Sequence, residues 1–527
     1  MLDAFVISIE ATGFDQTVYD VENLSAIRGA SLAMLYAPDK AEPALRRSRF
    51  SLEKIYSGAS EGAFWFAAEQ VRAEELKELA ADIRTAIHKS DLPDKGPYEH
   101  LGHAVSIVKV IGGDKSGALL RARALNAVQK RQSITWPLPD YDPDSKGFDE
   151  GGDRVRPAVI EYKYKKTEKW VSSAFKARHV FGNRERSKFY EKILFVKGFE
   201  PVVEDFEEMV AAPLGSLGAS LKTKTAVFFA DGNKLGTLAA SAIANGTITN
   251  YSRELKRHQE NLLTAINDWR AAGYLSHKTR HAVLNTDKSK EEWRWRFETL
   301  LWGGDEVCFV MPAWHAIEFV KLFFAATKGW TVTGTPVTQS AGLVICPHKT
   351  PIRQIKKIAE DLAKECKKNF TERSLLQIEI FESIALPDTG LDRYRKRLYG
   401  EAATHVSKQI TIDGDKLDGF VGTIVDLKKR FPRSQLYKLL RSGAKGDAGP
   451  ARFIKSSDVE NPHDKALRAE YATWLKRAGS ESKLDEKSLD ILEPPDRTAS
   501  VTLMVNLGML AMLWDYVQPF DDAEPQP

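Results

Sequence analysis

The sequence contains the same order of secondary-structure elements twice, and this repeat constrains the fold more than any other feature. Within residues 1–115, the spacing of apolar residues predicts a strand, a helix, two hairpin strands, a helix and a strand. Within residues 216–395 the same order is predicted again, followed by an amphipathic helix and a last strand. This is a split β-α-β pattern, so each segment is expected to form a sheet covered by helices.

The two segments can also be aligned residue by residue. IYSGASEGAFWF aligns without a gap with LLWGGDEVCFVM, AFVISIEAT with TAVFFADGN, and HAVSIVKV with SAGLVICP. The alignment gives each acidic position of the second segment a partner in the first: Asp231 with Glu10, Asp305 with Ser60, and Glu306 with Glu61. We interpret the segments as two related ferredoxin-like palm domains, of which the first lacks one acid.

The rest of the chain is predicted to form two further units. A Pro- and Asp-rich stretch at Pro137–Pro157 predicts a loop, which leads into a basic and aromatic-rich segment, Lys163–Lys192. Residues 116–215 are therefore expected to form a small domain between the palms. Residues 396–527 are expected to be mainly helical. The predicted class is α+β.

Composition excludes several classes of protein. Apolar residues make up 43% and charged residues 28% of the chain, as in folded globular proteins. The net charge of +4 requires no nucleic-acid partner by itself. Three cysteines without a CxxC pair predict neither a zinc site nor disulfides. No signal peptide is recognised, and Val501–Val517 carries Asn506 and Asp515, so a buried helix is expected instead of a membrane span. We expect a cytoplasmic protein.

Three acids are predicted to converge at one edge of the second sheet. Asp231 ends an apolar strand, and Asp305 and Glu306 follow Gly303 and Gly304 at a hairpin tip. Glycines permit a tight turn and a close approach of phosphate to the backbone. Because carboxylates repel each other, such a cluster favours bound Mg²⁺ or Mn²⁺, which could activate a ribose 3′-hydroxyl and stabilise pyrophosphate. The alternative is an ordinary hairpin turn.

Other residues could bind the nucleotide. The turn DGNKLG opens a helix, and its Gly232, Asn233 and Gly236 could hold phosphate at the helix N-terminus, unless it is a plain strand-to-helix turn. Basic side chains could neutralise a triphosphate, although exposed lysines are usually only solvated. The candidates are Lys349 after a strand, and Lys364, Lys367 and Lys368 on the next helix.

Two other patterns have competing interpretations. The aromatic residues of Lys163–Lys192 could stack on RNA bases while its cations follow phosphates, or they could pack inward beneath a solvated basic helix. The dipeptide His463–Asp464 has no accompanying histidine cluster, so we interpret it as a chance occurrence.

Several motifs resemble a known family. FFADGNKLG, LLWGGDEVCFVMP, SAGLVICPHKTPI and PRSQLYKLL are similar to motifs of the large polymerase-cyclase subunit of type III CRISPR effector complexes, the Csm/Cmr palm-domain family. RPAVIEYKYKKTEKWVSSAFKARHVFGNRERSKFYE resembles the segment between that family's palms. The resemblance implies two palms, a small domain between them and a helical C-terminal domain.

The resemblance also implies an activity. ATP would be converted to cyclic oligoadenylate within a complex that contains guide RNA, target RNA and other subunits. By motif position, Asp231, Asp305 and Glu306 would be the metal ligands, and Ser340 would lie near a nucleobase.

Three departures from the family pattern keep other functions open. The chain has GGDE where the family usually has GGDD, it lacks the zinc-binding cysteines between the palms, and it starts at the first palm strand without an HD nuclease domain. We therefore expect no single-stranded DNase activity. The alternatives are a stand-alone GGDEF-like synthase of a cyclic dinucleotide and a non-catalytic RNA-binding subunit with a vestigial palm.

Overall fold

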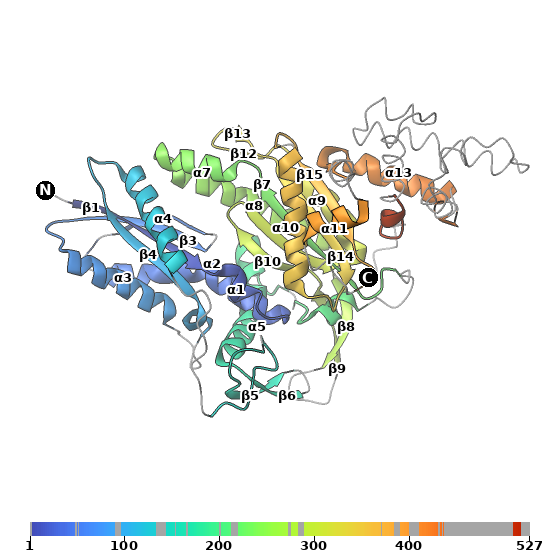
Figure 1. Cartoon of the computed structure of the whole chain (residues 1–527), viewed down its shortest axis with the longest axis horizontal. Helices are drawn as coiled ribbons and strands as arrows, with labels where there is room; N and C mark the ends of the chain where they lie inside the picture. The colour runs from blue at the N-terminus through green and yellow to red at the C-terminus, as the bar shows by residue number, and fades with distance from the viewer. Residues whose placement is uncertain are drawn as a thin grey trace, which may run out of the picture.

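A four-stranded sheet lies at the N-terminal end of the molecule, with strand order β2-β3-β1-β4 (Figure 1). Its strands are β1 (Asp3–Thr12), β2 (Leu52–Gly58), β3 (Glu61–Ala68) and β4 (Gly102–Lys109). Its helices are α1 (Phe14–Val18), α2 (Leu24–Arg47), α3 (Ala73–His88), the 3-10 helix η1 (Pro97–His100) and α4 (Lys115–Gln132). The computed structural model describes residues 3–47, 50, 52–58, 60–89, 96–132, 144–152, 154–164, 167–199, 202–211, 220–271, 276–282, 289–369, 371–383, 390–399, 410–430, 433–434, 436 and 510–517.

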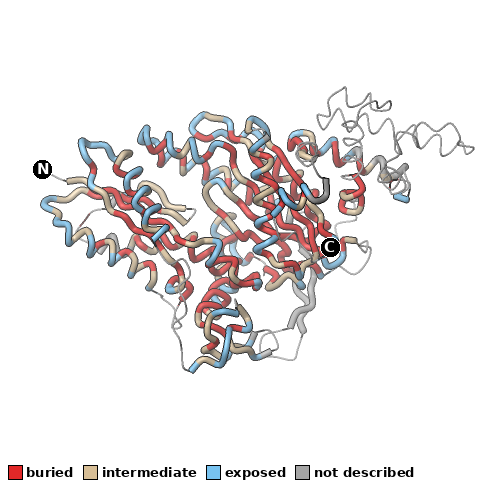
Figure 2. Tube along the Cα trace, in the orientation of Figure 1, coloured by how far each residue is buried: buried red, intermediate tan, exposed pale blue. Residues whose placement is uncertain are grey.

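A six-stranded sheet forms the centre of the molecule, with strand order β10-β11-β7-β14-β15-β16 (Figure 1). Its strands are β7 (Lys224–Gly232), β10 (Glu298–Gly303), β11 (Glu306–Pro312), β14 (Gln339–Pro347), β15 (Leu375–Ile380) and β16 (Ile412–Asp413). The accompanying helices are α7 (Leu235–Ala244), α8 (Ile248–Ala271), η2 (Ala313–His315), α9 (Ala316–Thr327), α10 (Ile352–Asn369), α11 (Leu391–Tyr399), η4 (Gly414–Lys416) and α13 (Leu417–Arg430). The strands are buried between these helices, so the core is centred on this sheet (Figure 2).

Smaller elements connect and extend the two sheets. The hairpins are β5 (Ile160–Tyr164) with β6 (Thr167–Val171), β8 (Ser276–Ala282) with β9 (Ser289–Trp295), and β12 (Thr331–Val332) with β13 (Thr335–Pro336). The helices α5 (Ser173–Leu194) and α6 (Phe206–Val210) lie between the sheets in sequence.

The two sheets share one topology, because β2-β3-β1-β4 corresponds to β10-β11-β7-β14. Glu10 pairs with Glu61 in the first sheet, and Asp231 pairs with Glu306 at the same place in the second. Both hairpins also contain a register shift, at Ile55 in β2 and at the aligned position in β10. The α+β class with two palm sheets is therefore confirmed.

The structure corrects two details of the sequence analysis. Asp231 pairs with Ser340 in β14, whereas Glu10 pairs with Ala104 in β4, so the aligned partner of Ser340 is Ala104 and not His103. A slip of one residue is hard to detect in a strand that is apolar on both faces. In addition, β16 adds a strand to the second sheet from residues that were expected to be helical.

Helix α5 packs closely along α2 of the first palm. A Cβ atom on Gly29 would lie 1.9 Å from the carbonyl oxygen of Arg178, and one on Gly182 would lie 1.9 Å from that of Ser25, so the crossing requires glycine on both helices. The aromatic residues of this segment point inward: Phe175, Phe181, Phe189 and Tyr190 are buried. The hypothesis that these rings stack on RNA bases is wrong for these four residues.

The described C-terminal residues pack against the second palm. Leu510, Leu513 and Trp514 are buried, as expected for this apolar segment. The hydroxyl of Tyr516 accepts a hydrogen bond from Lys224 Nζ at 2.5 Å, at the start of β7. Within the described residues, no helix has the length and apolar character to cross a membrane. His463–Asp464 lies outside the described residues.

A buried charge cluster links the two sheets and α5. Glu298 is fully buried at the start of β10, and its Oε1 lies 3.1 Å from Arg28 Nε of α2. Its Oε2 lies 3.4 Å from Arg186 Nη1 of α5, which also donates to the carbonyl of Val203 at 2.6 Å. Burial raises the pKa of Glu298, and the two arginines oppose that shift. Glu298 thus links β10 to α2 and to α5.

We predict that Glu298→Gln lowers the free energy of unfolding by about 3–5 kcal/mol, because it leaves two buried guanidinium groups without their counter-charge. Urea denaturation of the full chain, followed by tryptophan fluorescence, measures this loss. The matched control is Glu318→Gln, which breaks a partly exposed pair with Lys321 at 2.9 Å and should cost less than about 1 kcal/mol. Equal effects of the two variants would contradict the role of the cluster.

Candidate functional site

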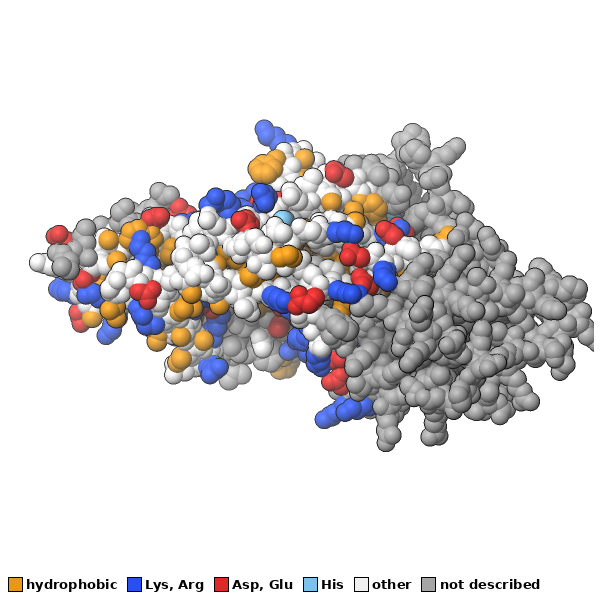
Figure 3. Space-filling model, turned by 90° about the horizontal axis from the view of Figure 1, so that it is seen from above, with side chains coloured by type: hydrophobic (Ala, Val, Ile, Leu, Met, Phe, Trp, Pro, Cys, Tyr) orange, Lys and Arg blue, Asp and Glu red, His pale blue; other side chains and the backbone are white. Residues whose placement is uncertain are grey.

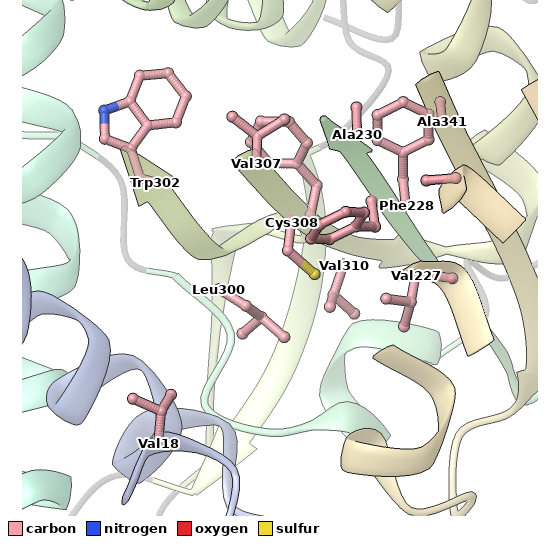
Figure 4. Packing of buried hydrophobic residues seen from close by; sticks show 14 of the residues in the cluster. Val18, Val227, Phe228, Ala230, Leu300, Trp302, Val307, Cys308, Val310 and Ala341 are labelled. Carbon is pink, nitrogen blue, oxygen red and sulfur yellow. The ribbon is translucent and has the colours of Figure 1, made fainter. Parts of the chain in front are cut away.

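Asp231 and Glu306 lie side by side on the neighbouring strands β7 and β11. The turn before Glu306 needs glycine, because φ is 141° at Gly303 and 63° at Gly304. The amide of Gly232 donates to the carbonyl of Asp305 at 2.8 Å, which ties the hairpin tip to the end of β7. Apolar side chains of both strands pack beneath this end of the sheet (Figure 4).

The hairpin tip is also held from the helix side. Gln259 of α8 donates from Nε2 to the carbonyl oxygen of Gly304 at 2.9 Å. Asp305 is exposed at the tip, whereas Asp231 and Glu306 are half-buried. The structure therefore pairs two of the three predicted acids closely and places the third at the rim.

Repulsion and burial shift the pKa values of the acid pair. Burial, together with the charges of Asp305 and Asp231, raises the pKa of Glu306 to about 7. Burial also raises the pKa of Asp231, and the ammonium of Lys367 opposes the shift. Lys367 Nζ lies 2.5 Å from Asp231 Oδ2, whereas the buried Oδ1 of Asp231 has no hydrogen-bond partner among the described residues. The single ion pair with Lys367 therefore leaves Asp231 Oδ1 without a partner and does not cancel the rise in either pKa.

The donor set of this pair fits a divalent cation. Carboxylate oxygens are the ligands that Mg²⁺ prefers, and a buried oxygen without a partner is costly unless something binds it. The described side chains do not bring three His, Cys, Asp or Glu residues close enough to form a ready-made metal cluster. Asp231 and Glu306 would thus supply two ligands, and Asp305 at the rim, together with water or substrate phosphates, would complete the coordination, as is usual for Mg²⁺.

The turn after β7 is stabilised by its own side chains. Asn233 donates from Nδ2 to Thr338 Oγ1 and accepts a hydrogen bond from Ser340 Oγ, both at 2.8 Å. Ser340 is fully buried and supports this turn through its hydrogen bond to Asn233. Its place near a nucleobase stays a prediction. A Cβ on Gly236 would meet nothing within 4 Å, so the start of α7 is open on that side.

The candidate lysines lie at different distances from Asp231 along the second sheet. β14 runs antiparallel to β7, so Pro347 pairs with Lys224 at the far end of the strand from Asp231. Lys349 follows Pro347, so this pairing places it at the opposite edge of the sheet from Asp231. Its binding to a triphosphate stays a prediction, which this position does not favour. Helix α10 then returns along the sheet and brings Lys367 to Asp231.

The other two lysines on α10 have different surroundings. The charge of Lys364 opposes the rise in the pKa of Asp231, after the larger effect of Lys367. Lys368 is exposed and its Nζ lies 2.5 Å from Glu365 Oε1. The direction of α10 thus selects Lys367 and Lys364 from the candidate set.

The first palm contains a related but neutralised acid pair. Lys130 Nζ lies 2.6 Å from Glu10 Oε2, and Arg123 Nη2 lies 2.6 Å from Glu61 Oε2. The buried Asn126 donates to Glu10 Oε1 at 3.2 Å. These three α4 residues were missed from the sequence, although two cations spaced two helix turns apart, and therefore on one face of α4, are the available signal.

Each palm has an ion pair between a lysine and an acid at the equivalent place. Lys130 lies fifteen residues after the first residue of α4, and Lys367 lies fifteen residues after the first residue of α10. Each contacts the acid near the end of the central strand, Glu10 or Asp231. The difference is that the first palm adds Arg123 and Asn126, whereas the second leaves its acids short of partners.

Comparisons with known proteins agree with this geometry. Residues 224–376 match the family model described as Cas10/Cmr2, second palm domain. The fold resembles the Csm1–Csm4 cassette solved in complex with cA4 and the same cassette solved in complex with AMPPNP. In both cases the TM-score is 0.51 and the identity 14%, over 97% of this chain and 70% of that chain. A comparison with curated proteins finds no match.

At this identity the structural likeness establishes the fold, and the family model covers the segment that carries the acid pair. The resemblance inferred from the motifs is thereby confirmed. Residues 224–376 therefore match the second palm domain of the Cas10/Cmr2 family.

Proposed function

We propose that this chain is a metal-dependent nucleotidyltransferase that converts ATP into cyclic oligoadenylate. The observation that carries the proposal is the half-buried pair of Asp231 and Glu306, with its raised pKa values, in a palm of the Cas10/Cmr2 family. Structures of similar fold have been solved with cA4 and with AMPPNP, which supports an adenine nucleotide as substrate.

Different residues of the second palm have different roles in the proposed reaction. Asp231, Glu306 and the adjacent Asp305 would hold Mg²⁺ or Mn²⁺, and such an ion lowers the pKa of a bound hydroxyl and stabilises charge on phosphate. Lys367, which is paired with Asp231 in this structure, would turn to the triphosphate once a cation neutralises that acid. The bare backbone at Gly304 and at the open side of Gly236 would let phosphates approach closely.

In the proposed reaction, each bond that forms is matched by a bond that breaks. A ribose 3′-oxygen forms a bond to the α-phosphorus of a second ATP, the bond to pyrophosphate breaks, and the hydroxyl proton passes to solvent. After repetition, the chain's own terminal 3′-hydroxyl attacks its 5′-terminal α-phosphorus. The bond to the last pyrophosphate breaks, the hydroxyl proton passes to solvent, and the ring closes. The site thus needs acids that bind cations and a lysine for phosphate, and the second palm supplies both types.

The proposed setting is a type III CRISPR effector complex with guide RNA, target RNA and other subunits. Similar folds have been solved as Csm1–Csm4 cassettes, which supports a partner subunit. On the face in Figure 3, Lys and Arg side chains alternate with acids and do not gather into one basic patch. Contacts with RNA would then depend on local cations such as the exposed Arg184 and Lys188 on α5 and should weaken with salt.

A second candidate product follows from the GGDE turn. Glu306 replaces the second aspartate of the usual family motif, and GGDEF cyclases carry the same sequence. A cyclic dinucleotide synthase that uses GTP is therefore the competing function. The substrate assay below includes every nucleoside triphosphate for this reason.

We predict that Asp231→Asn and Asp305→Ala each lower product formation by at least about 100-fold, the scale on which loss of one charge-stabilising group acts. The purified chain, alone and in its cognate complex, is incubated with each nucleoside triphosphate and Mg²⁺ or Mn²⁺, and products are identified by mass spectrometry. ATP-derived cyclic oligomers support the proposal. Wild-type rates in a folded Asp231→Asn protein would overturn the site, and cyclic products from GTP alone would favour the competing function.

We predict that Glu61→Ala leaves product formation within about twofold of wild type, because Arg123 and Lys130 already neutralise the first acid pair and leave it no ligand capacity. The same mass-spectrometric assay measures the rate, at saturating ATP. A loss as large as that of Asp305→Ala would mean that the first palm takes part in the chemistry.

We predict that Glu306→Gln stabilises the metal-free protein at pH 8 while it abolishes turnover. The pKa of Glu306 is raised from 4.5 to about 7. Its stabilising contribution is therefore complete below about pH 4.5 and is lost as pH rises through 7, so at pH 8 the ionised acid costs at most about 3 kcal/mol. Thermal denaturation in chelator at pH 5 and pH 8 tests this. A variant with lower stability than wild type at pH 8 would contradict the shift.

A further inference from the structure

Lys356 is a buried lysine on α10 that the reaction as described does not use. Only 5% of the residue is exposed, and lysines are rarely buried unless paired. Its Nζ donates to Glu360 one turn later on the same helix and to Asp15 Oδ1 of α1 at 3.0 Å. Burial disfavours the ammonium, but the two acids outweigh this effect and raise the pKa of Lys356, so it is charged.

This ammonium lies on the face of the sheet that carries the acid pair. Asp231 and Phe229 are two residues apart on β7, as are Glu306 and Cys308 on β11, so all four share one face. Phe229 pairs with Cys308 directly beneath Asp231 and Glu306, about 7 Å along the strands. Lys356 Nζ lies 5.9 Å from the centre of the Phe229 ring.

A glycine lets α10 approach this face closely. Gly342 of β14 pairs with Phe229, and a Cβ at this position would lie 2.1 Å from the carbonyl oxygen of Ala359. Any side chain at Gly342 would push α10 away from the sheet. This close approach brings the Lys356 ammonium to the part of the sheet beneath Asp231 and Glu306, on the face that α10 covers.

The first palm completes the surroundings of the ammonium. Tyr19, which follows α1, presents its ring 4.8 Å from Lys356 Nζ and is buried. Asp15 belongs to α1 itself, so the cluster joins the first palm to α10 of the second. Among the charges that act on Glu306, Glu360 is repulsive and Lys356 attractive. The groups that join the first palm to α10 thus include two whose charges act on Glu306.

We propose that Lys356 is a positioning residue for the acid pair of the second palm. Its buried charge neutralises Glu360 and Asp15, holds α1 of the first palm against α10, and places one fixed positive charge behind Asp231 and Glu306. This inference rests on the proposed function for its catalytic part. The interface part concerns the apoprotein and can be tested without substrate.

The test uses the full chain with Lys356→Met, which keeps the length of the side chain and removes its charge. The matched control is Lys357→Met, because Lys357 is the exposed neighbour on α10 and also pairs with an acid four residues later, Asp361. We expect Lys356→Met to lower kcat on the order of tenfold, with KM for ATP little changed, as for loss of groups that orient ligands. Lys357→Met should leave both at wild-type values.

A second change separates charge from packing. Lys356→Met leaves the Glu360 carboxylate unopposed behind the acid pair, so Lys356→Met with Glu360→Gln should recover most of the lost kcat. A double variant as slow as the single one would show that packing, not charge, explains the loss, and would overturn the proposal. Wild-type kcat in Lys356→Met, or a rise in KM alone, would do the same.

Hydrogen exchange provides a measure that does not depend on turnover. Lys356→Met should speed amide exchange in residues 14–18, because α1 loses its tie to α10, whereas Lys357→Met should not. Unchanged exchange would overturn the interface part. If Lys356→Met does not fold, Asp15→Asn is used, since Asp15 is about half exposed and the same rise in exchange is expected. If wild type makes no product from any nucleotide, the proposed function fails while the exchange result still decides this inference.

Discussion

The pairing register of β7 with its two neighbours positions every group at the acidic edge. Asp231 pairs with Glu306 on one side and with Ser340 on the other. Side chains alternate between the faces of a strand, so a slip of one residue would move an acid to the opposite face. Phe228 and Phe309 on the far face contact Phe319 in this register, and a slip would move one of these rings to the opposite face and break the contact.

The two palms show how one scaffold can hold acids in two electrostatic states. Both have an acid at the end of the central strand, an acid on the adjacent hairpin strand, and a lysine at the same place on the following helix. In the first palm Arg123 and Asn126 satisfy the acids, which makes the pair a structural element. In the second palm burial and mutual repulsion remain uncompensated, and such a pair is poised to bind cations.

Buried charges also connect the domains. Glu298 holds an arginine from α2 and another from α5, and Lys356 holds an acid from α1. Breaking a buried pair leaves an unpaired charge, so these contacts resist separation of the domains strongly. The relation between the two palms is therefore fixed by a few long-range pairs in addition to apolar packing, and one of them lies directly behind the acid pair.

The repeated element order, the hairpin and the candidate acids could be predicted from the sequence, because strand and helix periods and strand-end acids are local signals. It did not determine which lysine reaches the acids. Lys349 follows a strand whose antiparallel pairing takes it to the far edge, whereas Lys367 is 136 residues from Asp231 and meets it only because α10 folds back along the sheet. The burial of Ser340 and Lys356 was likewise decided by tertiary structure, since it depends on how closely helices and the first palm approach the second sheet. Such contacts join residues that are distant in sequence, and no local pattern records them.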